Sequence, residues 1–501
     1  MKELEEEFLQ EANRREIAGI NRRTLAFILS ASVRETLPSR NIYVHFSLGS
    51  VYYYTFTGGA GASQDEIDKL RAEMRRLVEQ DIKIYPRDLD YYDALDYFLK
   101  NKQNDTAMLI NQRGRYRIKV NQMNDFIDMY YAPLFPRTGL ISAFDISPYH
   151  EGFLLRFPYA GSDSNKLEEI PKNTKIFLAC DEYKKWGRIT GIRAACHINK
   201  RIMDGTIKDF IRINEAFQEK KLSIIADEIY KRRENVKIIL IAGPSSSGKT
   251  TTAKRLSIQL KVLGIEPVPI SLDDYYLHSD KAPKDENGNP DLECLEALDV
   301  DYFNKQLLDI LDGKETTLPV FDFKTGTRRD GKTIRLGNRR EVLLIEGIHG
   351  LNDALTNQIK NENKFKIYVS VLAQINVDDH NRVSVQDNRL LRRIVRDNQF
   401  RKTSALRTIA MWESVQRGAE KHIFRFENSA DAVFNSALDY EIPVIKCYVE
   451  PLLRGIKPGA AEYGEASHLL DFLDNFNVLP PQAVPGNSIL REFIGESDFK
   501  Y

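Results

Sequence analysis

The stretch GPSSSGKTT, residues 243 to 251, constrains the fold of this chain more than any other feature. It fits the pattern G-x-x-x-x-G-K-[ST], with the fixed positions at Gly243, Gly248, Lys249 and Thr250. The apolar run Ile238 to Ala242 precedes it, and an apolar stripe with helical spacing follows and stops near Gly264. A strand, a glycine-bounded loop and a helix in this order predict a phosphate-binding loop.

The chemistry of such a loop comes mainly from its backbone. Its N–H groups and those of the following helix carry partial positive charges that converge on bound phosphates. Lys249 is expected to reach the β and γ phosphates, and the Thr250 hydroxyl to join a Mg²⁺ shell. The predicted nucleotide contacts of the loop are Gly243, Ser245, Ser246, Ser247, Gly248, Lys249, Thr250 and Thr251. This motif alone does not separate a kinase from a GTPase or a motor ATPase.

From Val236 onward, short apolar runs alternate with longer polar segments of helical character. The runs are KIILIA, EPVPIS, EVLLIEG, FKIYVSVL and IPVIKCYV. Continuous apolar strands alternating with helices predict a buried parallel sheet with helices on both faces. The fold class expected for this part is therefore α/β.

Four regions differ in pattern. Residues 1–160 mix aromatic strand-like runs with a helix that starts at a capping box, Ser63 and Glu66, and they predict an α+β domain. The apolar face of that helix is Ile67, Leu70, Met74, Leu77 and Val78. Residues 161–235 indicate a helical connector, whose last helix carries Phe217, Ile225 and Ile229 on one face. The P-loop domain should span 236–455, and 456–501 should form a tail that packs on it, with a helix around HLLDFLDNF.

Composition excludes several classes of protein. Lys plus Arg equals Asp plus Glu, at 72 each, so no global charge attracts nucleic acid or an acidic membrane. The four cysteines form no C-x-x-C pair, which argues against a disulfide framework or a cysteine zinc site. The charged start lacks the apolar core of a signal peptide, and no run approaches the ~18 apolar residues that span a bilayer. We expect a cytoplasmic protein without a membrane partner.

Two acidic positions follow predicted strands. SLDDYYLH comes after the run EPVPIS, where ligands bind in open α/β sheets, so Asp273 is placed to accept a substrate proton or hold metal-bound water. Asp274 and Tyr275 are expected to be structural, as a cap and a packed ring. Glu346 ends the apolar run VLLIEG, where an unpaired charge is costly, and Mg²⁺ is the natural partner.

A third element, DNRLLRRIVRD, supplies cations. On a helix its arginines, Arg389, Arg392, Arg393 and Arg396, share one arc, opposite an apolar arc that anchors the helix. Guanidinium groups on one arc can close over a triphosphate and neutralise charge in the transition state, or they can form a solvated face paired with acids.

Together these motifs resemble the uridine kinase and phosphoribulokinase family over about residues 236 to 450. The resemblance rests on GPSSSGKTT, SLDDYY, NPDLECLEALD, FDF-x-x-G-x-R, LLIEG and DNRLLRRIVRD, in that order. It implies that Asp273 is the general base and that Tyr276, Asp291 and Arg389 contact the acceptor. It further implies that Arg392 and Arg396 bind phosphates and that Glu346 helps to hold Mg²⁺.

One position departs from that family. Where nucleoside-specific members carry a histidine that contacts the pyrimidine base, this chain has Gly326 in DFKTGTR. Kinase chemistry is unaffected, but recognition of a base is put in question. Basic residues nearby, Lys324 and Arg328, would favour an acceptor that carries a phosphate.

The amino-terminal region resembles the second additional domain of threonyl-tRNA synthetase over about residues 45 to 160, above all in SQDEIDKLRAEMRRLVEQDIKIYPRDLDYYDALDYF. In synthetases that domain edits mischarged tRNA with H-x-x-x-H and C-x-x-x-H sets. His45 has no partner four residues away, and Cys180 and the Cys196–His197 pair have the wrong spacing. The whole chain resembles bacterial nucleoside kinases that join the two parts.

The sequence therefore predicts an ATP- and Mg²⁺-dependent kinase for a small ribose-bearing acceptor, most simply the 5′-hydroxyl of a pyrimidine nucleoside. Asp273, Lys249 and Arg392 are its expected catalytic residues. One alternative keeps the kinase and takes a sugar phosphate or polyol as acceptor. The other is an ATP-regulated RNA-binding protein, against which the balanced charge weighs. A homo-oligomer stays open.

Overall fold

The structure is a computed structural model of the chain. It describes residues 14–48, 51–58, 61–158, 166–167, 175–278, 281–284, 288, 291–322, 325–337, 340–372 and 375–500. Within these residues no helix combines the length and the apolar character needed to cross a membrane.

The chain packs as two units, each built from three segments of sequence. Unit 1 comprises Met1–Ile207, Ala373–Ser384 and Gly464–Asn477, and unit 2 comprises Lys208–Leu372, Val385–Tyr463 and Val478–Tyr501. Packing therefore divides the predicted tail, 456–501, between the two units. The predicted boundary near residue 160 lies outside the described residues, and the other boundaries stay predictions.

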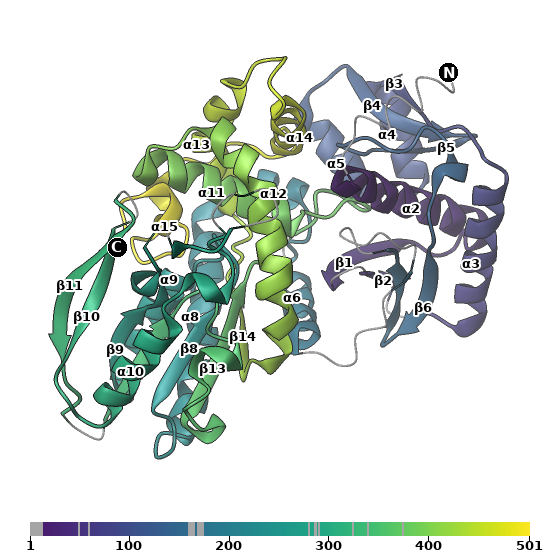
Figure 1. Cartoon of the computed structure of the whole chain (residues 1–501). Helices are drawn as coiled ribbons and strands as arrows, with labels where there is room; N and C mark the ends of the chain where they lie inside the picture. Colours follow the sequence, from purple (N-terminus) through teal and green to yellow (C-terminus); the bar gives the residue numbers. More distant parts are fainter. Residues whose placement is uncertain are drawn as a thin grey trace. The chain divides into compact units, whose positions relative to one another are not determined.

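Unit 2 is built on a five-stranded parallel sheet in the order β14-β13-β8-β12-β9 (Figure 1). The strands are β8 (Ile238–Ala242), β9 (Glu266–Ser271), β12 (Glu341–Glu346), β13 (Lys364–Ser370) and β14 (Ala432–Asn435). β8, the strand that leads into the P-loop, is central, and β12 separates it from β9. Four of the five predicted apolar runs form strands of this sheet, which confirms the predicted α/β class.

Both faces of the sheet are covered, as the continuous apolar runs predict. On one face Ile238, Leu240 and Leu343 belong to a core that includes Phe303 and Leu307 of α10 (Val300–Leu311). The alternate strand residues Ile239, Ile241 and Leu344 are equally buried, so the opposite face is covered as well. The remaining helices of the unit are α8 (Ile207–Lys231), α9 (Lys249–Val262), α11 (Val385–Arg401), α12 (Ala405–His422), α13 (Glu441–Arg454) and α15 (Arg491–Ile494).

The fifth apolar run, IPVIKCYV, is not a strand. It forms the first part of α13, and the outer strand β14 comes from AVFN instead. Pro443 lies in the first turn of α13, where its missing N–H costs no helical hydrogen bond. Val449 and Leu453 extend the buried face at helical spacing. The run alone could not distinguish a strand from a buried helix, and the helical spacing of Val449, at its end, and Leu453, beyond it, fits a helix.

An antiparallel hairpin extends unit 2 beyond the sheet. Strand β10 (Thr316–Asp322) pairs with β11 (Thr327–Ile334), and the pair projects at the left of Figure 1. Its turn includes Gly326, whose N–H donates to the carbonyl of Asp322 at 2.8 Å.

Unit 1 has α+β architecture with two antiparallel sheets, as predicted for the amino-terminal region. One sheet has the order β1-β2-β7-β6 and the other β3-β4-β5. Its strands are β1 (Ile42–Leu48), β2 (Val51–Phe56), β3 (Tyr85–Asp90), β4 (Arg117–Met123), β5 (Phe126–Asp128), β6 (Asp145–Tyr149) and β7 (Gly152–Arg156). Its helices are α2 (Arg14–Thr36), α3 (Gln64–Glu79), α4 (Tyr91–Lys100), α5 (Asn104–Arg113), α6 (Lys175–Thr190), α7 (Ala195–Met203) and most of α14 (Tyr463–Leu473).

The predicted capping box of unit 1 is confirmed at the start of α3. The Ser63 side chain accepts from the Glu66 N–H, and the Glu66 carboxylate accepts from the Ser63 N–H at 3.0 Å. The predicted apolar face is buried at Ile67, Leu70, Met74 and Leu77, in a core shared with α2, β1 and β2, and α3 contacts α2 and β6. The four cysteines are free thiols, as predicted.

Candidate active site

The P-loop joins β8 to α9, and its backbone is held in an unusual shape. Ser246 has φ +61° and Gly248 has φ +83°, both in the left-handed region. A β-carbon on Gly243 would lie 1.9 Å from the Val369 carbonyl oxygen, so only glycine allows the loop to pass this close to β13. Left-handed residues inside a loop turn successive N–H groups toward one point, as an anion-binding loop requires.

The side chains of the loop support the same assignment. The hydroxyl oxygens of Ser246 and Ser247 are buried and have no hydrogen-bond partner among the described residues. The Lys249 ammonium has one weak contact, to the Pro244 carbonyl oxygen at 3.5 Å. Buried polar atoms without partners are rare in folded proteins and call for an explanation such as a ligand.

Glu346 ends β12 beside the P-loop. In the sheet register it stands next to Ile241 on one side and Ser271 on the other, so three strands end at the same edge. Its Oε1 accepts from the Ser271 hydroxyl at 3.2 Å and lies 3.5 Å from the Thr250 hydroxyl. Burial and then the charge of Asp273 raise the pKa of Glu346 to about 7, against the opposing charge of Lys249. Two oxygen ligands and neighbouring carboxylates at one point fit a hard cation such as Mg²⁺.

The stretch SLDDYY follows β9 at this edge as a short 3₁₀ helix, η2 (Leu272–Tyr275). Asp273 is exposed, and its charge acts on Glu346. Asp274 points away and accepts from the Phe321 N–H at 3.1 Å. The Tyr275 ring is buried against Phe303 at 5.0 Å, and its hydroxyl donates to Gln306 at 2.8 Å. The structural roles predicted for Asp274 and Tyr275 are confirmed, although Asp274 caps a strand N–H rather than a helix.

Two of the predicted acceptor residues, Tyr276 and Asp291, follow this 3₁₀ helix in the chain. The Tyr276 hydroxyl donates to the Leu292 carbonyl at 3.0 Å, so this buried ring braces the segment 291–298. Asp291 turns back on its own backbone and accepts from the Glu293 N–H at 3.1 Å. Asp291 thus has a local structural contact in this structure, and its predicted role toward an acceptor stays a prediction.

Glu293, which the sequence did not single out, is the more conspicuous acid. Its Oε2 is sealed from solvent and has no hydrogen-bond partner among the described residues. Burial raises the pKa of Glu293, while the charges of Arg393, Lys249 and Arg389 oppose that rise. It is one of four acids in the stretch DLECLEALD, so no local signal in the sequence singles it out.

Two arginines of helix α11 contact Ser245 of the P-loop. The Arg389 Nε donates to the Ser245 carbonyl at 3.1 Å, and the Arg393 Nη1 donates to the Ser245 hydroxyl at 2.7 Å. The Arg389 guanidinium stacks over Trp412, and burial lowers its pKa to about 10. Arg393, which was predicted to share the arc but was given no role, is thus in contact with the loop.

The other two arginines are held by acids. Arg392 is fully buried, pairs with the equally buried Glu441, and donates to the Ser436 carbonyl at 2.9 Å. Its Nη1 also donates weakly to the Ser246 carbonyl of the P-loop at 3.4 Å. Arg396 donates to Asp397 at 2.9 Å. The predicted phosphate contacts of Arg392 and Arg396 stay predictions, but in this structure Arg392 joins α11 to α13 behind the loop.

The hairpin position that departs from the nucleoside-specific pattern is a tight turn. Gly326 has φ +65°, a conformation that favours glycine over histidine. Arg328 donates to Asp299 at 2.7 Å and stacks over Tyr302 at 5.2 Å. Lys324, the other basic residue considered for a phosphorylated acceptor, lies outside the described residues.

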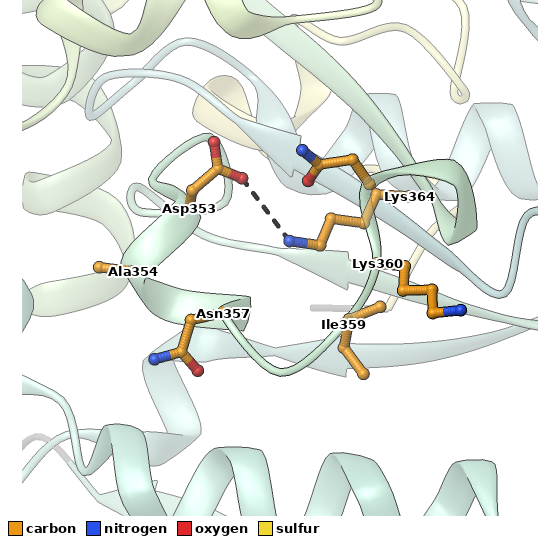
Figure 2. Close-up of a pocket in the computed structure, with 7 residues that line it drawn as sticks. Asp353, Ala354, Asn357, Ile359, Lys360 and Lys364 are labelled. Carbon is orange, nitrogen blue, oxygen red and sulfur yellow. Dashed lines mark ion pairs between the residues drawn. The ribbon is translucent and has the colours of Figure 1, made fainter.

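A pocket of about 540 Å³ lies elsewhere in unit 2, and Figure 2 shows its lining. Asp353 faces Lys364 across it, at 3.6 Å, and Asn357 and Lys360 complete the polar wall. Lys364 begins β13, so this pocket is at the amino ends of the strands. The P-loop, Glu346 and Asp273 are at the carboxyl ends, and the pocket is separate from the candidate active site.

Unit 1 brings together three residues with metal-binding side chains. Asp105, Cys196 and His197 have potential ligand atoms within 4.8 Å of one another. The His197 Nδ1 accepts from the Ala194 N–H at 3.2 Å, and the Arg193 guanidinium lies 3.7 Å from Asp105. A bound cation would need the His197 Nδ1 lone pair and the Asp105 negative charge, and both already interact with protein groups.

Comparison with known proteins separates the two parts of the chain. The amino-terminal region is similar to the threonine–tRNA ligase of Citrifermentans bemidjiense, with 24% identity over 132 residues, which is 26% of this chain and 21% of the ligase. The similarity thus covers a small part of the ligase, and it agrees with the resemblance seen in the sequence.

Other matches are to a kinase family and to kinases. The sequence model of the phosphoribulokinase / uridine kinase family matches residues 238–443. A uridine kinase of Ureaplasma parvum is 31% identical over 177 residues, 35% of this chain and 76% of its own length. A uridine kinase of Limosilactobacillus reuteri is 28% identical over 236 residues, 47% of this chain and 88% of its own. With the P-loop, the strand-end acids and these matches together, the chain belongs to the phosphoribulokinase / uridine kinase family and is a kinase that carries a threonine–tRNA ligase-like amino-terminal region.

Proposed function

We propose that this kinase transfers the γ-phosphoryl group of ATP to a hydroxyl of a small ribose-bearing acceptor, the 5′-hydroxyl of a pyrimidine nucleoside. Asp273 accepts the proton of that hydroxyl as its oxygen forms a bond to the γ-phosphorus. The bond between that phosphorus and the bridging oxygen breaks, and ADP leaves.

One observation carries this proposal. Asp273, Glu346 and the P-loop meet at the carboxyl edge of three adjacent strands, and the charge of Asp273 is close enough to raise the pKa of Glu346. A general base, a cation site and a phosphate site are the three parts that phosphoryl transfer to an alcohol requires.

The chain's own residues supply the phosphate and cation contacts. The P-loop backbone and Lys249 bind the phosphates, and Arg389 and Arg393 fix the loop through Ser245. Thr250 and Glu346 fit a bound Mg²⁺, which would neutralise charge on the phosphates. Arg389 is buried and Lys249, Thr250 and Glu346 are partly buried, which strengthens their electrostatic contacts.

The acceptor assignment has two supports. Relatives of this chain are described as uridine kinases, and the family model matches residues 238–443, which contain the site. Arg328 is engaged by Asp299 and Tyr302, which weighs against its binding the phosphate of a sugar phosphate. A screen of ATP consumption with Mg²⁺ over nucleosides, sugars, sugar phosphates and polyols tests the assignment, and turnover only with sugar phosphates or polyols would contradict it.

Replacing the base tests the mechanism. Asp273→Asn keeps the shape of the side chain and removes its basicity, so we expect turnover to fall by about 10²–10⁴, the usual contribution of general-base catalysis. ADP affinity should stay nearly unchanged, because Asp273 is not part of the P-loop.

Asp330→Asn is the matched control, since Asp330 is an exposed acid on β11. It should leave turnover at the wild-type level. Wild-type turnover in Asp273→Asn would show that another group takes the proton.

A further inference from the structure

The C-terminal helix α15 lies against the P-loop at the start of α9, where yellow and teal ribbons meet in Figure 1. Glu492 of this helix accepts two hydrogen bonds from Thr251, from the N–H at 3.1 Å and from the hydroxyl at 2.6 Å. Both donors belong to the second threonine of GKTT. A carboxylate that lies 241 residues away in sequence thus occupies donors of the phosphate-binding loop.

The segment that carries Glu492 is firmly packed. Ile489, Leu490, Phe493 and Ile494 are all buried. The Arg392 guanidinium stacks over the Phe493 ring at 5.1 Å. The buried neighbours of Glu492 therefore fix its backbone, and the position of its side chain at the loop follows from this packing.

The same segment covers the loop glycine. A β-carbon on Gly248 would lie 2.6 Å from the Ile489 Cγ2. Lys254, one turn further along α9, also donates to the carbonyl of Lys500 in the last part of the chain. The C-terminal segment thus contacts the loop and the first turns of α9 at several points.

An N–H group has one hydrogen and cannot donate fully to two anions at once. The N–H groups at the start of a P-loop helix and its hydroxyls are the groups that bind nucleotide phosphates. A phosphate oxygen and the Glu492 carboxylate would also repel each other at this distance. Nucleotide and Glu492 therefore compete for Thr251.

We propose that Glu492 is an internal occupant of the nucleotide site, which a nucleotide phosphate displaces from Thr251 when it binds. This inference rests on the proposed function, since it takes the P-loop as the nucleotide site. It follows that Glu492 lowers nucleotide affinity and that the segment Ser488–Gly495 responds when the site fills.

The inference is tested by ADP binding to the full chain, measured by calorimetry. Glu492→Gln keeps the shape and removes the charge, and Glu492→Ala also removes both acceptor oxygens. We expect ADP to bind at least about tenfold more tightly to each variant, the effect of losing a competing hydrogen bond to a charged group. Adenosine, which has no phosphate, should bind equally to all of them.

Glu496→Gln is the matched control, because Glu496 is an exposed acid directly after this segment and its partner is Arg491. It should bind ADP like the wild type. A second measurement needs no variant: hydrogen exchange of the amides in 488–495 should become faster when ADP is added to the wild type.

The outcomes are distinguishable. If Glu492 only caps α9, both variants lose stability and bind ADP no more tightly, and the inference is overturned. If neither the wild type nor any variant binds ADP, the proposed function fails and the inference fails with it. Tighter ADP binding by Glu492→Gln, with faster exchange in the wild type, supports it even if Glu492→Ala does not fold.

Discussion

Glu293 and Asp291 are two residues apart, yet their surroundings differ. Asp291 accepts from its own loop, whereas Glu293 has a sealed oxygen that finds no partner in the described part of the chain and lies in the field of Lys249, Arg389 and Arg393. An acid in this setting can accept hydrogen bonds from acceptor hydroxyls. We infer that Glu293 is the acid that contacts the acceptor.

The two acids are separated by kinetics. Glu293→Gln should raise the acceptor KM by about 10- to 100-fold, the range for losing a hydrogen bond to a charged group, with ADP affinity unchanged. Asp291→Asn should have a much smaller effect, because it alters a local turn. If Asp291→Asn raised the acceptor KM more than Glu293→Gln in steady-state kinetics, Asp291 would be the acid that contacts the acceptor.

At the level of elements, the sequence predicted the parts whose local patterns are strong. The strand, loop and helix around Lys249, four strands of the sheet and the helix α11 all follow from apolar spacing and from glycine. Two features could not be predicted. IPVIKCYV is too short to distinguish a strand from a helix, and the contact between Glu492 and Thr251 joins residues without any shared local pattern.

Arg392 illustrates the same limit. The arc on α11 predicted four similar arginines, but each side chain depends on what faces it from another element. Glu441, at the start of α13, faces Arg392 and holds its guanidinium, which leaves Arg392 a weak contact with the P-loop, to the Ser246 carbonyl. The contact between Glu441 and Arg392 could not be predicted, because the segment that follows Glu441 was expected to be a strand.

The pair that joins α11 to α13 gives a stability prediction. Arg392→Ala leaves Glu441 as a buried unpaired charge, and this should lower the free energy of unfolding by about 3–5 kcal/mol. Replacing both partners, Arg392→Met with Glu441→Leu, should cost less because no charge stays buried. Denaturant unfolding of unit 2 measures both effects.

Arg401→Ala is the control from the same helix, since Arg401 is half exposed and pairs with Asp397 at 3.7 Å. It should change the stability by no more than about 0.5 kcal/mol. If Arg392→Ala unfolds like the wild type but loses ADP affinity, Arg392 is a phosphate contact as first predicted.

At the scale of the whole molecule, stability should depend on pH through a buried pair in unit 1. The His380 Nδ1 lies 2.7 Å from Asp128. Burial alone would lower the pKa of His380, but the charges of Asp128, Asp379 and Asp378 raise it to about 9. The pair therefore stabilises the fold fully below pH 6.5, and this contribution is lost as pH rises toward 9.

The stability difference between His380→Gln and the wild type should depend on pH. At pH 6 the variant should have a lower unfolding midpoint than the wild type, because its free energy of unfolding is lower by about 3 kcal/mol. This difference between the two midpoints should shrink by pH 9.5. Thermal unfolding across this range measures the gap. A gap that is constant with pH would mean that His380 is neutral in the folded chain.

The order of segments in the two units also governs how the chain can be made. The last segment of unit 1, Gly464–Asn477, follows most of the residues of unit 2 in the sequence. During synthesis, unit 1 stays incomplete until residue 477 has left the ribosome, so the amino-terminal part waits for nearly the whole kinase sequence. Neither part can then be exchanged as a single continuous block of gene without leaving its partner unfinished.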